Sequence, residues 1–337
     1  MRLLMLGGTE FAGRAVVAAA LDRGWDVTVF NRGNRPAPEG VTALVGDRTA
    51  PGGLAAIADG TWDVVVDTWT AAPTAVRDTA RLLADRVGRY VYVSSCSVYV
   101  WPAPPNSDES APLVAATEDD TDVPYAESKR GGELAAIGAF GADRSLLVRA
   151  GLLLGPWENV GRLPWWLARA VRGGAVLAPE PADAPVQYID IRDMAEWILS
   201  AAEAGLSGPY NMVGAQRGVT FGDVLAECVR VTAEARAAAG PDGPDGLELR
   251  WTPARRILDA GVSPWTDLPI WVPPEEAPDL LGALYTLDVS RAMATGLRCR
   301  PLAETVADTW AWLRELPRMP SRPGVGLSPE REAALLR

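Results

Sequence analysis

The first 150 residues alternate short apolar runs with longer amphipathic segments. The apolar runs predict strands at residues 2–6, 26–30, 41–47, 62–69, 89–95 and 144–150. Residues 11–23 and 74–87 show the wider spacing of apolar positions that is typical of helices. Strands that are apolar along their length and alternate with helices indicate a parallel sheet covered on both faces. We therefore expect a doubly wound α/β domain.

The pattern changes after residue 150, where Pro- and Trp-rich stretches separate shorter amphipathic segments. We predict helices in this part at residues 168–172, 192–204, 221–237 and 302–316. The domain assignment is residues 1–150, with 184–205 returning to the same sheet, and a smaller C-terminal lobe formed mainly by 151–183 and 206–316. Residues 317–337 are a Pro/Gly-rich tail ending in a short amphipathic helix, for which we expect a docked or frayed terminus.

A glycine-rich turn separates the first predicted strand from the first predicted helix. Gly7, Gly8 and Gly13 lie where a glycine turn lets backbone amides and a helix N-terminus face a pyrophosphate. Glu10 occupies the usual place of a middle glycine, so a tight turn without a ligand is the alternative interpretation. The position of the turn at the start of a βαβ unit favours dinucleotide binding by a Rossmann-like fold.

The end of the second predicted strand carries no acidic residue. Folds that prefer NAD place a carboxylate there, about 20 residues after the glycines, where it binds the ribose 2′-hydroxyl. Asn31 and Arg32 occupy this place, and Arg35 follows. A guanidinium would pair with a 2′-phosphate, so we expect NADP(H) as the cofactor, with NAD(H) as the alternative. The other interpretation of the two arginines is a solvated turn.

The segment DVPYAESKRGG places Tyr125 four residues before Lys129. On a helix the two side chains share one face, and Asp122 and Pro124 are typical of a helix start, as a cap and a first-turn proline. An ammonium group near a phenol lowers the pKa of the phenol, as acid–base catalysis requires. The chain contains no histidine, so acid–base chemistry must rest on other side chains or on a cofactor.

Composition and charge limit the classes of binding partner and the location that we expect for this protein. The formal net charge of −11 would repel a phosphate backbone and argues against nucleic acid. No apolar run reaches the roughly 18 residues of a membrane span, and the N-terminus lacks a signal-peptide pattern, so we expect a cytoplasmic protein. Cys96, Cys228 and Cys299 are far apart and indicate buried free thiols rather than a disulfide or a metal site. The Ala-, Gly-, Arg- and Pro-rich, Lys-poor composition suggests a GC-rich bacterial source.

Several motifs together resemble the extended, atypical branch of the short-chain dehydrogenase/reductase superfamily, which includes NAD(P)-dependent epimerases, dehydratases and reductases. The resemblance covers most of the chain through GGTEFAG (7–13), VGD (45–47), VVVDTWTAAP (64–73), YVYVSSCSVY (90–99), LVRAGLLLGPWEN (147–159) and VQYIDIRDMAEWIL (186–199). It implies cofactor contacts from Gly7, Thr9, Glu10, Phe11, Gly13, Asn31, Arg32, Arg35, Asp47, Thr68 and Lys129.

The resemblance also implies a catalytic set formed by Ser95, Tyr125 and Lys129. Tyr125 would exchange a proton with a carbonyl or alcohol oxygen, and Lys129 would lower the pKa of Tyr125 and hold the nicotinamide ribose. Ser95 would hydrogen-bond the reacting oxygen, with Ser97 as the alternative. The implied substrate-binding residues are Ser97, Trp101, Trp157 and Asn159. Trp165, Trp166, Trp265 and Trp271 could extend an aromatic pocket or fill a core.

We expect a reductase or dehydrogenase that acts on a small-molecule carbonyl or alcohol. Enzymes of this branch that use nucleotide sugars often carry an arginine where this chain has Val186, which disfavours such a substrate unless Arg149 or Arg192 compensates. One alternative is an epimerase that retains its cofactor. A dehydratase is less favoured, because Cys96 stands where dehydratases place an acid.

Two further expectations come from the resemblance. A non-catalytic dinucleotide-sensing or RNA-binding relative is the alternative from another functional class, although the acidic charge and the Ser-Tyr-Lys set oppose it. Relatives often dimerise through helices equivalent to residues 74–86 and 125–140, so a homodimer is expected by analogy.

Overall fold

The computed structural model describes residues 1–215, 218–238, 246–320 and 322–337. These residues form two compact units, each made of three segments of the chain. The first unit comprises Met1–Leu153, Ile191–Gly214 and Leu287–Arg298. The second unit comprises Leu154–Asp190, Ala215–Thr286 and Cys299–Arg337.

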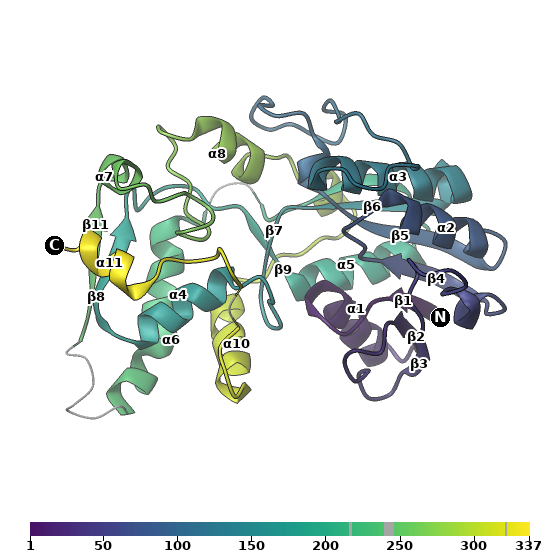
Figure 1. The fold of residues 1–337 in the computed structure, drawn as a ribbon, viewed down its shortest axis with the longest axis horizontal. Helices are drawn as coiled ribbons and strands as arrows, with labels where there is room; N and C mark the ends of the chain where they lie inside the picture. The colour runs from purple at the N-terminus through teal and green to yellow at the C-terminus, as the bar shows by residue number, and fades with distance from the viewer. Residues whose placement is uncertain (216–217, 239–245, 321) are drawn as a thin grey trace. The chain divides into compact units, whose positions relative to one another are not determined.

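The first unit is built on one parallel, seven-stranded sheet (Figure 1). From edge to edge its strands are β10 (Gly208–Met212), β6 (Ser145–Ala150), β5 (Val87–Ser95), β4 (Trp62–Asp67), β1 (Arg2–Leu6), β2 (Asp26–Asn31) and β3 (Thr42–Val45). The direction of chain progression reverses between β1 and β4, which is where doubly wound sheets bind ligands beyond the carboxyl ends of their strands. The predicted Rossmann-like α/β fold is confirmed.

Helices cover both faces of this sheet. Helices α2 (Pro73–Leu83) and α3 (Tyr125–Phe140) pack on one face, and α1 (Phe11–Asp22) and α5 (Ile191–Glu203) pack on the other (Figure 1). The short helix α9 (Ser290–Ala294) also belongs to this unit. Among the described residues, no helix combines the length and the apolar character that crossing a membrane would require.

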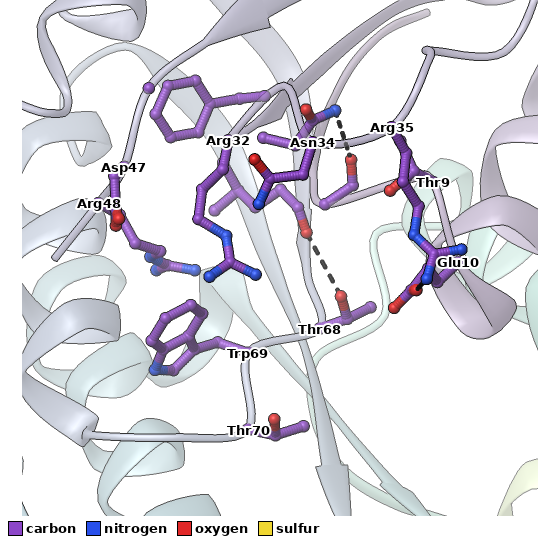
Figure 2. Close-up of a pocket in the computed structure, with 16 residues that line it drawn as sticks. Thr9, Glu10, Arg32, Asn34, Arg35, Asp47, Arg48, Thr68, Trp69 and Thr70 are labelled. Atoms are coloured by element: carbon purple, nitrogen blue, oxygen red, sulfur yellow. Dashed lines mark hydrogen bonds and ion pairs between the residues drawn. The ribbon is translucent and has the colours of Figure 1, made fainter. Parts of the chain in front are cut away.

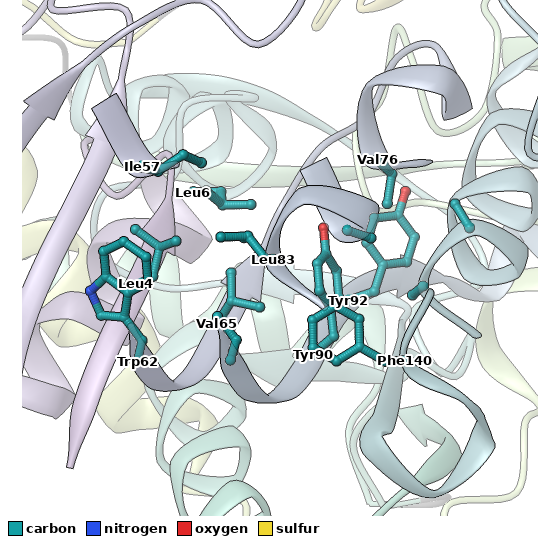
Figure 3. Packing of buried hydrophobic residues seen from close by; sticks show 14 of the residues in the cluster. Leu4, Leu6, Ile57, Trp62, Val65, Val76, Leu83, Tyr90, Tyr92 and Phe140 are labelled. Carbon is teal, nitrogen blue, oxygen red and sulfur yellow. The ribbon is translucent and has the colours of Figure 1, made fainter. Parts of the chain in front are cut away.

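The core beneath α2 and α3 follows from the alternation of side chains along buried strands. Leu4 and Leu6 of β1 point into this core, together with Tyr90 and Tyr92 of β5 and Phe140 of α3 (Figure 3). Both tyrosines are fully buried, so their hydroxyls need partners inside the protein. The Tyr90 hydroxyl donates to Asp67 Oδ2 at 2.5 Å, and that of Tyr92 donates to the Trp69 carbonyl at 3.1 Å.

The observed units differ from the predicted domain assignment at their later segments. Residues 208–212 form β10, which pairs in parallel with β6, so residues 206–214 belong to the sheet rather than to the second lobe. Residues 287–298 also join the first unit, whereas 184–190 belong to the second. The sequence GPYNM did not predict a strand, because it contains Asn211, a polar residue that can be buried only with partners far away in the sequence. One of these partners is Tyr99, whose hydroxyl donates to Asn211 Oδ1 at 2.5 Å.

The second unit contains mainly helices and one parallel pair of strands. Its elements are α4 (Arg162–Val171), β8 (Gly174–Pro179), β9 (Tyr188–Asp190), α6 (Phe221–Ala238), β11 (Leu247–Thr252), α7 (Ala254–Asp259), α8 (Pro278–Tyr285), α10 (Leu302–Glu315) and α11 (Pro329–Leu335), with β7 (Leu152–Leu154) at the boundary. Helix α4 begins six residues before its predicted start, because Pro164 is tolerated in a first helical turn. The Pro/Gly-rich sequence AAAGPDGPDGLE (237–248), which predicts a loop, lies largely outside the described residues.

Two of the tryptophans considered for a substrate pocket are core residues of the second unit. Trp166 and Trp271 are fully buried, and their indole N–H groups donate to the carbonyls of Pro269 at 2.6 Å and of Glu180 at 3.0 Å. A buried indole with its one donor satisfied is a packing residue. These two side chains are therefore not available as a substrate surface.

The C-terminal tail is docked on the second unit. Glu332 of α11 is buried, and its carboxylate accepts from Arg169 Nε at 2.6 and 2.7 Å and from the Leu177 amide at 3.1 Å. A buried, hydrogen-bonded ion pair of this kind holds a terminus in one place, because separating it would leave a buried charge unpaired. The docked alternative for residues 317–337 is thus the observed one.

Residues 117–120 lie against the face formed by α2 and α3. Arg77 pairs with Asp119, Arg81 Nη2 lies 2.5 Å from Glu118 Oε1, and a Cβ on Gly131 of α3 would lie 2.5 Å from the Thr117 carbonyl oxygen. A homodimer through these two helices, which stays a prediction, would have to accommodate this segment.

The three cysteines are free thiols, as predicted. Cys96 and Cys228 are buried, and burial raises the pKa of both thiols. Cys299 is exposed, so the expectation of burial is wrong for this residue. It lies in the segment between α9 and α10, outside any helix or strand of the described residues.

Candidate active site

A cavity of about 510 Å³ opens beyond the carboxyl ends of β1 to β4 (Figure 2). It lies at the switch point of the sheet, where a doubly wound fold places its ligand. Its walls come from the turns that follow these strands: Leu6, Gly7, Gly8, Thr9, Glu10, Phe30, Asn31, Arg32, Asn34, Arg35, Gly46, Asp47, Arg48, Thr68, Trp69 and Thr70. The predicted cofactor residues Gly7, Thr9, Glu10, Asn31, Arg32, Arg35, Asp47 and Thr68 are thereby brought together.

The glycine loop adopts a conformation that depends on its glycines. Gly7 and Gly8 adopt φ values of +109° and +89°, which side chains rarely allow. A Cβ on Gly13 would lie 2.7 Å from the Gly8 amide nitrogen, so α1 approaches the loop closely only because Gly13 is a glycine. Phe11, buried at the start of α1, and Gly13 therefore shape the loop from behind the cavity.

The N-terminus of α1 is open toward an anion. Glu10 is the N-cap residue, and its side chain does not cap the first helical amides. These amides are free of a side-chain cap and carry the positive end of the helix dipole, so the loop and helix fit a pyrophosphate.

Asn31 at the end of β2 supports the glycine loop. Its side-chain nitrogen donates to the Gly7 carbonyl at 3.4 Å, and its oxygen accepts from the Gly33 amide at 2.8 Å. Asp47 lies across the cavity, where hydrogen bonds from the Thr49 hydroxyl and amide, and more weakly the charge of Arg32, lower the pKa of its carboxyl. Arg35 forms an ion pair with Glu10.

A buried ion pair behind the cavity was not predicted. Arg48 donates to both oxygens of Asp67 at 2.8 and 2.9 Å, and Asp67 also accepts from the Tyr90 hydroxyl. Burial by itself raises the pKa of Asp67, but the charge and hydrogen bonds of Arg48 outweigh it and hold the pKa below its usual range. The sequence indicated no role for Asp67. Arg48 follows the VGD motif and carried no signal of its own.

Trp69 connects this ion pair to the predicted catalytic lysine. Its ring lies 5.0 Å from the Arg48 guanidinium, and its amide donates to Asp67 Oδ1 at 3.0 Å. Its carbonyl accepts from Lys129 Nζ at 2.6 Å and from the Tyr92 hydroxyl. Because Trp69 lines the cavity, Lys129 is bonded directly to a wall of the dinucleotide pocket.

Lys129 is buried, with only 2% of its surface exposed. Its ammonium donates to the Trp69 carbonyl and, at 2.7 Å, to the Val93 carbonyl of β5. Burial lowers the pKa of Lys129 from 10.5 to about 7. Lys129 is also the only lysine among the 32 basic residues of the chain. An arginine guanidinium does not lose its proton in proteins, whereas a lysine amine can. The one lysine of the chain therefore supplies a titratable amine that an arginine at this position could not.

Ser95 ends β5, two residues after Val93. Its Oγ accepts from the Ser97 amide and lies 3.1 Å from Ser97 Oγ, so the two candidate hydroxyls are neighbours. Tyr125 is the first residue of α3 and is 49% exposed, one helical turn before Lys129. Pro124 is the N-cap of α3 rather than a first-turn residue, so the predicted cap at Asp122 is wrong.

Arg149 does not compensate for the missing arginine at Val186. It is buried, and it donates to both Glu133 oxygens at 2.9 and 3.1 Å and to the Tyr99 hydroxyl at 3.1 Å. A guanidinium committed to a buried carboxylate is not offered to a substrate phosphate. Of the two arginines considered as replacements, only Arg192 on α5 stays a prediction.

The predicted substrate residues are divided between the units. Ser97 and Trp101 belong to the first unit, and the Trp101 ring packs edge-on against Tyr99 with centroids 6.0 Å apart. Trp157 and Asn159 belong to the second unit, in the segment before α4, where Trp157 adopts a φ of +68°. Their substrate contacts stay predictions.

Because Lys129 is unique, its ionisation can be measured directly. In protein labelled with ¹³C-lysine, the single ε-methylene resonance is expected to titrate with a midpoint near pH 7, because burial disfavours the charged amine. The same resonance in denaturant should titrate near the ordinary lysine value of about 10.4. Since the unfolded chain then holds the extra proton, this group makes the free energy of unfolding rise with pH between the two midpoints. A folded midpoint above about 9 would contradict the desolvated amine.

The fold and the site fit a protein that binds a nicotinamide dinucleotide. A parallel doubly wound sheet carries a glycine-lined pocket at its switch point, and a buried lysine adjoins that pocket. The chain belongs to the NAD dependent epimerase/dehydratase family, whose family model matches residues 3–213.

Similar proteins include one reductase and several epimerases. A 3-diazoavenalumate denitrifying reductase from Streptomyces sp is 26% identical over 287 residues, covering 78% of this chain and 86% of that protein. A putative epimerase from Burkholderia cenocepacia J2315 is 20% identical, with a TM-score of 0.67 and coverage of 92% of this chain and 97% of that one. The UDP-glucose 4-epimerase of Thermus thermophilus, solved with NAD, is 21% identical, with a TM-score of 0.63 and coverage of 94% and 99%. At these identities the two structures show a shared fold.

Proposed function

We propose that this protein is an NADP(H)-dependent oxidoreductase that transfers a hydride to or from a small-molecule carbonyl or alcohol. The observation that carries the proposal is the pair of hydrogen bonds made by Lys129. Its amine bonds to Trp69, which lines the dinucleotide pocket, and to Val93, two residues before Ser95. A titratable amine, the pocket and the serine pair therefore adjoin one another beyond β4 and β5.

Each residue has a distinct part in this proposal. A bound nicotinamide dinucleotide would supply or accept the hydride. The Tyr125 hydroxyl gives a proton to the substrate oxygen during reduction and takes it back during oxidation. Lys129 favours the ionised form of that hydroxyl when it carries its proton, and the Ser95–Ser97 pair hydrogen-bonds the same oxygen.

The preference for NADP(H) rests on Arg32 and Arg35, which line the pocket and follow β2, where the sequence has no acidic residue at the place that binds a ribose 2′-hydroxyl in NAD-preferring folds. NAD(H) is the alternative, since the family description and the Thermus enzyme both name NAD. We propose a small-molecule substrate, a cytoplasmic location and no nucleic-acid partner, in keeping with the net charge of −11.

Among the reactions of the family, reduction is supported best. The Streptomyces relative is a reductase, and its name gives a diazo compound as substrate, so a diazo compound belongs beside carbonyls in a substrate panel. Dehydration would need an acid beside the serine, whereas the Cys96 thiol is buried with a raised pKa and donates to the Arg149 carbonyl at 3.0 Å. An epimerase that retains its cofactor is the remaining alternative.

The first test is an absorbance spectrum and cofactor assay on freshly purified protein, followed by NADPH and NADH titrations. We expect protein that retains no dinucleotide, and that binds NADPH reversibly and more tightly than NADH, because each turnover of a reductase exchanges its cofactor. Cofactor that survives purification would instead favour the epimerase, whose cycle returns the hydride. Equal or tighter binding of NADH would refute the NADP(H) assignment.

A further inference from the structure

Glu10 and Arg35 form an ion pair at the edge of the dinucleotide pocket (Figure 2). Glu10 is the N-cap residue of α1, beside the amides that suit a pyrophosphate, and Arg35 follows β2, where a ribose phosphate would lie. Both side chains line the cavity. The pair therefore places a carboxylate among the groups that suit the phosphates of a dinucleotide.

This ion pair differs from the other one at the pocket. Arg48 and Asp67 are buried, with side-chain exposures of 7% and 0%, so their pairing is permanent. Arg35 and Glu10 are 63% and 41% exposed, and exposed pairs are weak and screened by salt. A phosphate of a dinucleotide, which carries at least one negative charge and several acceptor oxygens, can thus take the place of Glu10 on the Arg35 guanidinium.

We propose that Glu10 is a specificity-determining residue of the pocket, whose carboxylate competes with a phosphate of the bound dinucleotide for Arg35. This inference rests on the proposed dinucleotide function. Without a ligand, Glu10 is the ion-pair partner of Arg35. A phosphate that binds Arg35 must replace this ion pair, so Glu10 lowers the free energy gained from the phosphate contact. Dinucleotide affinity and the preference for NADPH over NADH are then set jointly by Arg35 and by its internal competitor.

The test compares the whole protein with its E10Q variant by calorimetric titration of NADPH and NADH. Glutamine keeps the size of the side chain and removes its charge, so NADPH should bind about two- to fivefold more tightly, the range expected for loss of one exposed ion pair. E39Q is the matched control, because Glu39 is an exposed acid of the same loop outside the cavity lining and should leave both affinities unchanged.

The two ligands identify the phosphate. Tightening of NADPH alone assigns the competition to the 2′-phosphate, and equal tightening of NADH assigns it to the pyrophosphate, which both ligands share. The inference is overturned if E10Q changes neither affinity while wild-type protein binds dinucleotide. Wild-type protein that binds neither ligand would overturn the proposed function itself, and this inference with it.

A second variant shows whether Glu10 acts through Arg35. In an R35Q background the guanidinium is gone, so adding E10Q should change NADPH affinity less than it does in the wild type. An equal gain in both backgrounds would mean that Glu10 only repels the ligand, and would overturn the competition. R35Q alone should weaken NADPH about tenfold or more, as expected for loss of a charge-assisted contact to phosphate.

Discussion

Replacing Tyr125 with phenylalanine is expected to lower turnover by about two to four orders of magnitude, the usual contribution of general acid–base catalysis. The change removes one hydroxyl at the start of α3, one turn before Lys129, and leaves the ring. The chain contains no histidine that could replace the lost proton donor. Initial rates with the substrate found in the carbonyl and diazo panel measure the loss.

Two controls separate catalysis from folding in this variant. Tyr125 is 49% exposed, so the melting temperature should stay within the scatter of surface substitutions. Dinucleotide affinity should also be retained, because Tyr125 does not line the cavity. Near-full activity would refute the role of Tyr125. With a diazo substrate, an unaffected rate would indicate a reduction that needs no proton from this residue.

The Asp67→Asn variant is expected to lose about 3–5 kcal/mol of folding free energy, the usual cost of removing one partner of a buried ion pair. Asparagine keeps the shape of the side chain, so the loss reports the charge that Arg48 no longer faces. Arg48 is 7% exposed, so the variant leaves a largely buried guanidinium without its carboxylate partner. Urea unfolding of the wild-type and variant proteins measures the difference.

The matched control is Asp63→Asn, on the same strand. Asp63 pairs with Arg2 at 3.6 Å, but both side chains are about half exposed, so this variant should lose less than about 1 kcal/mol. The pKa of Asp67 is lowered in the folded state. Its contribution to the free energy of unfolding is therefore complete above the ordinary carboxyl pKa and is lost as the pH falls through the pKa of the folded state. Similar small losses in both variants would contradict a buried, permanent pair.

The sequence alone determined six of the seven strands of the sheet and the glycine turn after the first of them. All six predicted strands appear within about two residues of their predicted starts and ends, because strands of a parallel sheet are buried on both faces and so carry continuous apolar runs. The predicted strand at 62–69 ends at Asp67, because Thr68 and Trp69 turn into the pocket wall. The glycine loop could also be predicted, since Gly7 and Gly8 adopt a backbone conformation that few other residues allow.

The tertiary structure alone decided the pairings on which the site depends. Arg48 and Asp67 are 19 residues apart, and Lys129 is 60 residues from the Trp69 carbonyl that it contacts. The strand at Gly208–Met212 likewise joins the sheet through an amide satisfied 112 residues away. Local patterns of apolar and polar residues encode which face of an element is buried. They do not encode which distant polar group will meet a buried charge, because that partner is chosen only when the elements pack.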